Sequence, residues 1–523
     1  MWRLIVSLSL LFLLPDMQLM SQKPAGGNDP DTPLRVEIPA HSVNETYRIL
    51  SCGNKGLVLF FRSQEAPDDA HTNWYFSCYD TNLQQTWVKS IPLFNDQDYR
   101  FQDNGKDTLA LLFGHTGKSK GPENSFEIVR IALRTGTMIL NTGSVAPGTD
   151  IDAFGVCKGR GWLGLNVRNQ AGKILNLDLA RGITRLFSLG NGNQISVLWM
   201  KPDSNATSLS AIVGRQISKK SVEYYLVKYD TAGVIKREVL IGTQSGERTL
   251  TQVRVAATAQ GAELVMGSYG QGVPVSSQKN KSPDESTGLF ATLIKEGAQR
   301  GINFYNFLEM KSASAIVGES DIVSLKKKAL KKQKTLAEYS LDYSVLMHDV
   351  IEDGDHLVLT AEFFSPQYHT ESFTDFDFYG RPYTNSYSVF DGYRFYNALV
   401  AGFDSDGKLL WDNYIDMRNL VSFELSPKVV TFPSGDDLVL CYVSDGKIGS
   451  KFIHEGTVVE KLDFSAIEML NPDDKLLAET KGGLIHWYSN YFLSYGYQDI
   501  KNIALETNNK RLVFYFSKLR FEK

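Results

Sequence analysis

One pattern recurs along this sequence and limits what the chain can fold into. Each repeat begins with a polar or glycine-containing turn, which is followed by an apolar, β-rich run. A loop then leads to a second run, a turn such as Asp-x-x-Gly ends that run, and a third run follows. Such clusters of Asp, Asn and Gly supply the tight turns of β-hairpins. Eight first runs are found, at residues 56–61, 108–113, 162–167, 209–213, 262–267, 356–363, 437–442 and 483–487. The sequence therefore predicts short strands almost throughout.

The spacing of these runs predicts the fold class. Units of three or four short strands that recur about every 45 to 60 residues are typical of a β-propeller, whose blades are four-stranded sheets. Eight repeats predict eight blades, or seven if the first and last repeats share one blade, and residues 34–39 are the expected closing strand. We therefore expect an all-β propeller of seven or eight blades. It would form a single domain over residues 34–523, with insertions at about 305–345 and 364–396.

Residues 403–411, Phe-Asp-Ser-Asp-Gly-Lys-Leu-Leu-Trp, illustrate the turn chemistry. They are superficially similar to the repeat motifs of sialidase and quinoprotein propellers, but their spacing fits neither. An Asp-x-x-Gly turn followed by a bulky residue that packs between blades accounts for them without ligand chemistry.

The amino-terminal segment has the pattern of an export signal. Arg3 precedes an apolar run of eleven residues at 4–14, and Ser21 gives a small residue at a cleavage point before Gln22. Eleven apolar residues are too few to span a bilayer, so we expect residues 1–21 to be removed, with an uncleaved anchor as the alternative. A flexible leader would follow at 22–33, and the product would be periplasmic, at the cell surface or secreted.

The chain contains four cysteines, Cys52, Cys78, Cys157 and Cys441. In an exported protein they are candidates for disulfides, and Cys52 with Cys78 is the one pair that flanks a predicted hairpin. The alternative is four buried thiols that pack as small apolar groups.

Charge and motifs exclude several classes of function. A net charge of -4 and a pI near 6.1 argue against general binding to nucleic acid. The sequence contains no GxSxG, HExxH, CxxC, GxxxxGK[ST] or Rossmann glycine pattern. These motifs therefore support no serine hydrolase, zinc protease, redox protein or nucleotide binder. The cofactor stays unknown, no metal site is assigned and no catalytic residues can be named.

One helix is expected, from Asp321 to Tyr339. Its lysines, all between Lys326 and Lys334, could bind anions or a membrane surface. The alternative, a solvated helix face on an insertion, agrees with the lack of aromatic residues among the lysines.

The stretch at residues 364–396 has the strongest bias, because twelve of its thirty-three residues are Phe or Tyr. We expect a long aromatic-rich loop, bent at Gly380, Pro382 and Gly392, that either packs onto the scaffold or stacks on sugars and grips extended peptides. The candidate ligand-binding residues are Tyr379, Arg381, Tyr383, Tyr387, Asp391, Tyr393 and Arg394.

Polar side chains that could form a paired-carboxylate or His-carboxylate metal site gather around this stretch. None has diagnostic spacing, and alternation along a strand points neighbours to opposite faces. The candidates are His348, Asp349, Asp353, Glu362, His369, Asp375, Asp377, Arg381, Asp391 and Arg394.

The segments AEFFSPQYH, YGRPY and VFDGYRFYNALVAGFDSDGKLLWDN, within residues 361–413, and more weakly CGNKGLVLFFRS near Cys52, carry a resemblance. They resemble a family of exported, propeller-like bacterial proteins of uncharacterised function. The resemblance implies a cell-envelope or secreted address and supplies no catalytic residues. We expect a module that binds a glycan or a peptide or protein ligand, with a propeller hydrolase or lyase acting on glycans as the alternative.

Overall fold

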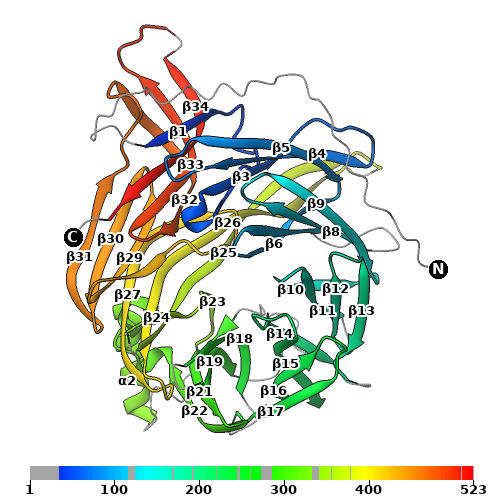
Figure 1. The fold of residues 1–523 in the computed structure, drawn as a ribbon. Coiled ribbons are helices and arrows are strands. Elements are labelled where there is room, and N and C mark those ends of the chain that lie inside the picture. The colour runs from blue at the N-terminus through cyan, green and yellow to red at the C-terminus, as the bar shows by residue number, and fades with distance from the viewer. Residues whose placement is uncertain are drawn as a thin grey trace. The chain divides into compact units, whose positions relative to one another are not determined.

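The computed structural model describes residues 34–521 apart from 116–123, 168–169, 191–193, 219–220, 244–247, 259–260, 272–284, 333–340, 355, 377 and 508. The expected signal segment and leader lie outside these residues. The described strands form eight sheets, seven of four strands and one of six. The chain is an all-β propeller, as the repeats predict (Figure 1).

The chain divides into two compact units. Unit 1 comprises residues 1–217, 224–239 and 467–523. It holds sheets A to D and most of sheet E. Sheet A contains β1 (Arg35–Pro39), β34 (Lys510–Arg520), β33 (Tyr491–Asn502) and β32 (Asp474–Tyr488). Sheet B contains β2 (Arg48–Ser51), β3 (Leu57–Arg62), β4 (His71–Tyr79) and β5 (Gln85–Phe94), with a short 3-10 helix, η1 (Gly53–Lys55), between β2 and β3.

The other sheets of unit 1 follow in chain order. Sheet C contains β6 (Gln97–Asn104), β7 (Thr108–His115), β8 (Asn124–Ala132) and β9 (Thr137–Val145). Sheet D contains β10 (Thr149–Cys157), β11 (Arg160–Val167), β12 (Lys173–Asp178) and β13 (Ile183–Ser188). Sheet E contains β14 (Ile195–Pro202), β15 (Ser208–Ser218), β16 (Ser221–Asp230) and β17 (Ile235–Ile241).

Unit 2 comprises residues 218–223 and 240–466. Sheet F contains β18 (Arg248–Ala257), β19 (Glu263–Gln271), β21 (Gly288–Lys295) and β22 (Ala298–Asn306). Sheet G contains β20 (Glu285–Ser286), β23 (Tyr343–Met347), β24 (Ile351–Asp353), β25 (His356–Phe376), β26 (Pro382–Phe403) and β27 (Leu409–Ser422). Sheet H contains β28 (Val430–Ser434), β29 (Asp437–Ser444), β30 (Lys447–His454) and β31 (Thr457–Ala466). Between β22 and β23 lie η3 (Phe307–Glu309), α1 (Ala313–Val317) and α2 (Glu319–Lys332).

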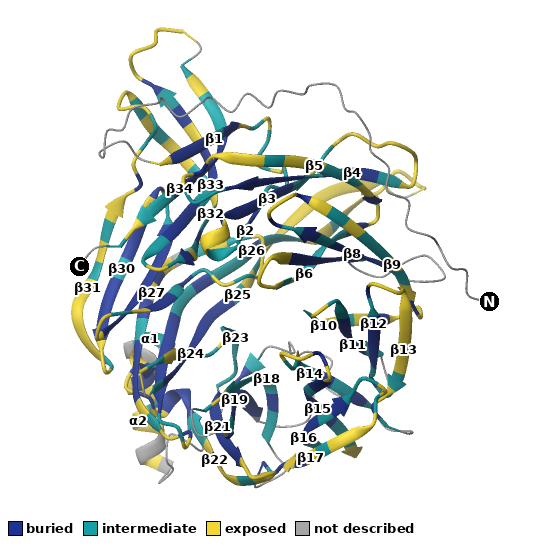
Figure 2. Ribbon diagram, viewed as in Figure 1, coloured by how far each residue is buried: buried dark blue, intermediate teal, exposed yellow. Residues whose placement is uncertain are grey.

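Successive sheets within each unit share apolar cores. Separate clusters of buried side chains join sheets A and B, B and C, C and D, and D and E in unit 1, and F and G and G and H in unit 2. Middle strands are therefore covered on both faces and read as continuous apolar runs, as in β7 and β29. The strands β7 and β29 are mostly buried, whereas outer strands such as β13 and β31 are largely exposed (Figure 2).

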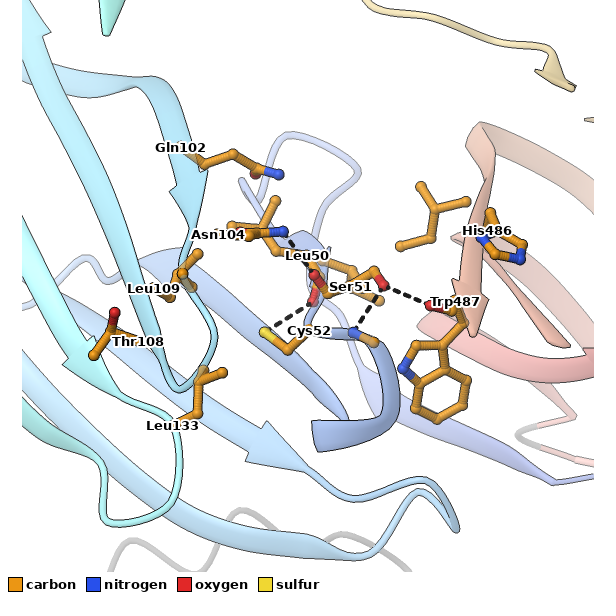
Figure 3. A pocket seen from close by; sticks show the side chains of 14 residues that line it. Leu50, Ser51, Cys52, Gln102, Asn104, Thr108, Leu109, Leu133, His486 and Trp487 are labelled. Atoms are coloured by element: carbon orange, nitrogen blue, oxygen red, sulfur yellow. Dashed lines mark hydrogen bonds between the residues drawn. The ribbon is translucent and has the colours of Figure 1, made fainter. Parts of the chain in front are cut away.

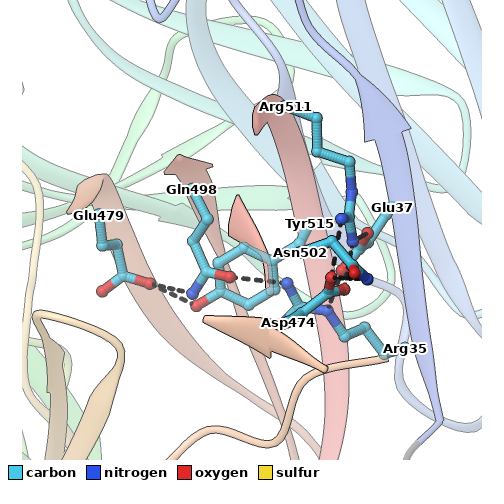
Figure 4. Close-up of polar contacts among 8 residues, drawn as sticks. All are labelled: Arg35, Glu37, Asp474, Glu479, Gln498, Asn502, Arg511 and Tyr515. Carbon is cyan, nitrogen blue, oxygen red and sulfur yellow. Dashed lines mark hydrogen bonds and ion pairs between the residues drawn. The ribbon is translucent and has the colours of Figure 1, made fainter. Parts of the chain in front are cut away.

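The expected closing strand is confirmed, because β1 pairs with β34 in antiparallel register from Arg35↔Ser517 to Pro39↔Val513. A polar network, drawn in Figure 4, holds these terminal strands together. The Arg35 guanidinium donates to Glu37 (2.8 Å) and to Gln498 (2.6 Å), and Arg511 donates to Glu37 (2.9 Å) and to Asp474 (3.0 Å). The hydrogen bonds from Arg511 lower the pKa of Asp474.

The expected Asp turns are also confirmed. In sheets B, E and G the Oδ1 of Asp80, Asp230 and Asp404 accepts hydrogen bonds from the backbone N–H groups two and four residues later, at 2.8–3.0 Å. Each of these turns leads into the outer strand that follows in the sheet. The side chain supplies the turn geometry that the sequence pattern implies.

Aromatic side chains after these turns pack on glycines of the next sheet. Trp411 lies in the core between sheets G and H, and a Cβ on Gly456 would sit 2.5 Å from the Trp411 Cβ. Trp87 contacts Gly136 in the same way. The interpretation of residues 403–411 as a structural turn is therefore confirmed.

The structure corrects three expectations. The aromatic stretch is part of β25 and β26 and not a loop. The expected helix is present as α2 but starts at Glu319, and the end of the expected span lies outside the described residues. The four cysteines are free.

Sheet B explains why Cys52 and Cys78 do not bond. Cys52 follows β2 and Cys78 lies in β4, and β3 runs between these two strands. Two strand spacings amount to about 10 Å. A disulfide needs Cα atoms within about 7 Å. Cys78 and Cys441 are buried, as the alternative of packed thiols predicts, whereas Cys52 and Cys157 are partly exposed.

Candidate functional site

The aromatic stretch forms the outer part of a long hairpin in sheet G. Strands β25 and β26 pair from Leu357↔Phe403 to Phe376↔Pro382 (Figure 1). The third strand, β27, pairs with β26 only as far as Tyr393↔Ser422. Beyond that point the hairpin is a ribbon of two strands. We call this part, residues 367–392, the hairpin arm.

Alternation along the strands gives the hairpin arm two faces. Glu371 lies opposite Tyr387 and Asp375 opposite Tyr383, so these side chains share one face. We call it the acidic face. It includes His369, Glu371, Phe373, Asp375, Tyr383, Tyr387 and Asp391.

Hydrogen bonds connect the polar groups of the acidic face. His369 Nδ1 lies 2.6 Å from Asp391 Oδ1, and His369 Nε2 lies 3.3 Å from Glu371 Oε1. The Tyr387 hydroxyl donates to Glu371, and the Tyr383 hydroxyl donates to Asp375 at 3.2 Å. The bond to Asp391, and then that to Glu371, raises the pKa of His369, whereas the Tyr387 hydroxyl lowers the pKa of Glu371. These contacts fix the orientation of exposed polar groups.

The seven candidate ligand-binding residues are spread along the hairpin. Tyr379 is 79% exposed near the turn, where its ring centroid lies 5.8 Å from the Arg381 guanidinium carbon. Tyr383, Tyr387 and Asp391 belong to the acidic face. Between Tyr383 and Tyr393 ten residues of strand cover about 30 Å. A single small ligand does not reach all seven residues.

The base of the hairpin arm is a local core. The ring of Tyr393 packs 5.6 Å from that of Phe364 and 5.0 Å from that of Phe390. Arg394 is half-buried, and its Nε is buried without a hydrogen-bond partner. The stretch is therefore packed locally at its base and exposed to solvent farther out.

Several polar candidates near the stretch fall into two groups, whereas Asp349 pairs with Arg254 at 2.9 Å and Asp353 lies at the end of β24. His369, Asp375 and Asp391 lie on the hairpin arm, and Asp377 lies outside the described residues. His348 and Glu362 form a second group, in which Glu362 Oε1 lies 2.8 Å from His348 Nε2.

Glu362 is fully buried between sheets G and H. Its Oε1 also accepts the backbone N–H groups of Lys428 and Val429, both at 2.7 Å. Its Oε2 is buried without a hydrogen-bond partner. Burial lowers the pKa of the Lys428 ammonium, and the Glu362 carboxylate opposes that shift. This carboxylate anchors the chain before β28 to sheet G, which is a structural role.

A second buried acid, Glu127, was not expected from the sequence. It lies in β8 of sheet C with 1% of its surface exposed, and its Oε2 accepts the backbone N–H of Phe94 at 2.9 Å. Burial raises the pKa of Glu127 to about 7, mainly by penalising the charged form. The sequence around Glu127 contains no pattern that indicates a buried acid.

Unit 1 contains a cavity of about 460 Å³ that the sequence did not indicate (Figure 3). Three edge strands line it: β2 of sheet B, β6 of sheet C and β32 of sheet A. Its lining residues come from segments 49–53, 102–109 and 485–487, with Leu133. These segments lie too far apart in the chain for a local pattern to connect them.

Among the residues that the structure describes, no group of three His, Cys, Asp or Glu side chains is placed to hold a metal ion. None of the helices described above is long and apolar enough to cross a membrane.

Comparison with known proteins gives structural likenesses alone. No family profile matches the sequence, and no curated protein matches it. Among solved structures, the polysaccharide lyase Uly1 is 9% identical to this chain with a TM-score of 0.38. The aligned part covers 80% of this chain and 89% of the lyase chain. The periplasmic gluconolactonase PpgL of Pseudomonas aeruginosa is 10% identical with a TM-score of 0.36, and the aligned part covers 81% of this chain and 99% of the gluconolactonase. The β-propeller domain of the Trilobed protease from Pyrococcus furiosus is 6% identical with a TM-score of 0.32, and the aligned part covers 80% of this chain and 98% of that domain. The activities of these proteins are their own and are not transferred to this chain.

Proposed function

We propose that this protein is an exported propeller of the bacterial cell envelope that binds a glycan or an extended peptide through the hairpin arm. One observation carries the proposal: a two-stranded ribbon displays large aromatic side chains to solvent. Phe378 is 98% exposed, Tyr379 79% and Tyr387 51%. Exposed aromatic surface of this kind marks interaction sites, since folding alone would bury it.

The acidic face fits binding. Its hydroxyl, imidazole and carboxylate groups are fixed by mutual hydrogen bonds, so little conformational entropy is lost when a ligand meets them. Tyrosine rings can stack on sugar rings or on the side chains of an extended peptide, while the carboxylates accept hydrogen bonds from hydroxyl or amide groups. This combination supports recognition of a polymer along the ribbon.

The test is a binding screen against cell-envelope glycans and peptides, followed by Tyr383→Ala. Tyr383 is 45% exposed, so its removal should weaken binding by about 1 to 3 kcal/mol and leave the melting temperature almost unchanged. Tyr393→Ala is the matched control. Because Tyr393 packs on Phe364 and Phe390, this variant should lose thermal stability.

Two results would contradict the proposal. Unchanged binding in Tyr383→Ala, together with a large fall in melting temperature, would show that the exposed rings are only part of a local core. Turnover of a bound glycan by the unmodified protein would instead favour a propeller hydrolase or lyase.

A further inference from the structure

The cavity of unit 1 is a built site with a fixed floor. The Asn104 side-chain amide donates to the Ser51 carbonyl oxygen at 3.1 Å, which links sheet C to sheet B. The Ser51 hydroxyl donates to the Trp487 carbonyl oxygen at 3.2 Å, which links sheet B to sheet A. The Trp487 indole N–H in turn donates to the Gly56 carbonyl oxygen at 2.8 Å. These three side-chain hydrogen bonds tie sheets A, B and C together around the cavity.

The walls combine apolar and uncharged polar groups. Ile49, Leu109, Leu133 and Trp487 are buried and give the floor an apolar surface. Gln102, Asn104, Thr108 and His486 are exposed at the rim. Figure 3 shows Gln102 and Asn104 on one side of the cavity and His486 and Trp487 on the other. A ligand inside would meet hydrogen-bonding groups from two sides.

Gln102 offers the clearest contact for a ligand. Its Oε1 accepts the Tyr99 hydroxyl at 2.9 Å, which fixes the orientation of the amide. The Nε2 hydrogens are therefore the donors that a ligand oxygen would use. An oriented amide costs less to engage than a freely rotating one.

The charge of the lining selects the class of ligand. No Asp, Glu, Lys or Arg is among its residues. Lys55, at the end of η1, and Asp107, between β6 and β7, are not lining residues and pair with each other at 3.3 Å. A charged ligand would lose hydration without gaining a counter-ion, whereas a neutral ligand rich in hydroxyl groups would exchange water for the amide and hydroxyl groups of the rim.

We propose that this cavity binds a single uncharged saccharide unit. Its volume lies within the range of small-molecule sites. The site is separate from the proposed surface on the hairpin arm, because all its residues belong to unit 1 and the arm belongs to unit 2.

The test uses the full chain with labelled Ile and Leu methyl groups, observed by NMR. Methyl β-glucoside and methyl β-galactoside are the neutral probes, and glucuronate is the charged comparison. At least one neutral probe should shift the methyl signals of Ile49, Leu133 and Ile485 in a saturable way, and glucuronate should shift them less. Gln102→Ala should weaken that binding by about three- to tenfold, the effect of losing one neutral hydrogen bond.

Gln64→Ala is the matched control, because Gln64 is exposed on the connection between β3 and β4 and does not line the cavity. The Gln64→Ala variant should bind the neutral probe with the same affinity as the unmodified protein. Unshifted signals of Ile49, Leu133 and Ile485 would overturn the proposal, as would equal binding of glucuronate. An unchanged affinity in Gln102→Ala, with the other methyl signals in place, would overturn it as well.

Discussion

Glu127→Gln should stabilise the protein above about pH 7 and leave it unchanged in mild acid. Burial raises the pKa of Glu127 in the folded chain from 4.5 to about 7. The unfolded chain therefore loses this proton at a lower pH than the folded chain, so the free energy of unfolding falls as pH rises from about 4.5 to about 7. One pKa unit corresponds to about 1.4 kcal/mol, which gives a loss of about 3 kcal/mol. A neutral glutamine keeps an oxygen for the Phe94 N–H and avoids the loss.

Urea unfolding followed by circular dichroism at about pH 5 and about pH 8 measures the effect. The unmodified protein should be less stable at the higher pH, and the variant should gain about 3 kcal/mol there relative to it. Glu468→Gln is the control, because Glu468 is exposed and should not alter the difference between the two pH values. If Glu127→Gln destabilises the protein at about pH 8, or keeps the pH dependence of the unmodified chain, the reasoning from burial is refuted.

Two further predictions follow from the polar contacts of unit 2. Glu362→Leu leaves the Lys428 and Val429 N–H groups buried without an acceptor and should lower the free energy of unfolding by about 2 to 6 kcal/mol. Glu362→Gln, which retains the acceptor oxygen, should cost clearly less in the same urea titration, and equal losses would show that the oxygen is not what matters. An NMR titration of His369 should give a midpoint above 6.5, and Asp391→Asn should move it down, since the bond to Asp391 is the main cause of the raised pKa. A midpoint insensitive to that substitution would remove Asp391 as the cause.

The sequence by itself determined the propeller class, because the signals for it are local. Middle strands covered on both faces appear as unbroken apolar runs, as at residues 108–113 in β7 and 437–442 in β29. The turns at Asp80, Asp230 and Asp404 are encoded within five residues. Most strands pair with their neighbours in the chain, so short segments suffice to predict each sheet. The closing pair of β1 and β34 was predicted from the general need to cover an open edge.

The tertiary structure decided which side chains meet. The hairpin arm was mistaken for a loop because its mixed aromatic and polar sequence does not alternate like a half-buried strand, and only the pairing of β25 with β26 over its length defines it. Glu362 finds its backbone partners 66 and 67 residues away, and Ser51 finds Trp487 across 436 residues. Burial of Glu127 likewise results from the packing of sheet C against sheet B. Contacts between sheets depend on how whole sheets stack, and no local period in a sequence records that geometry.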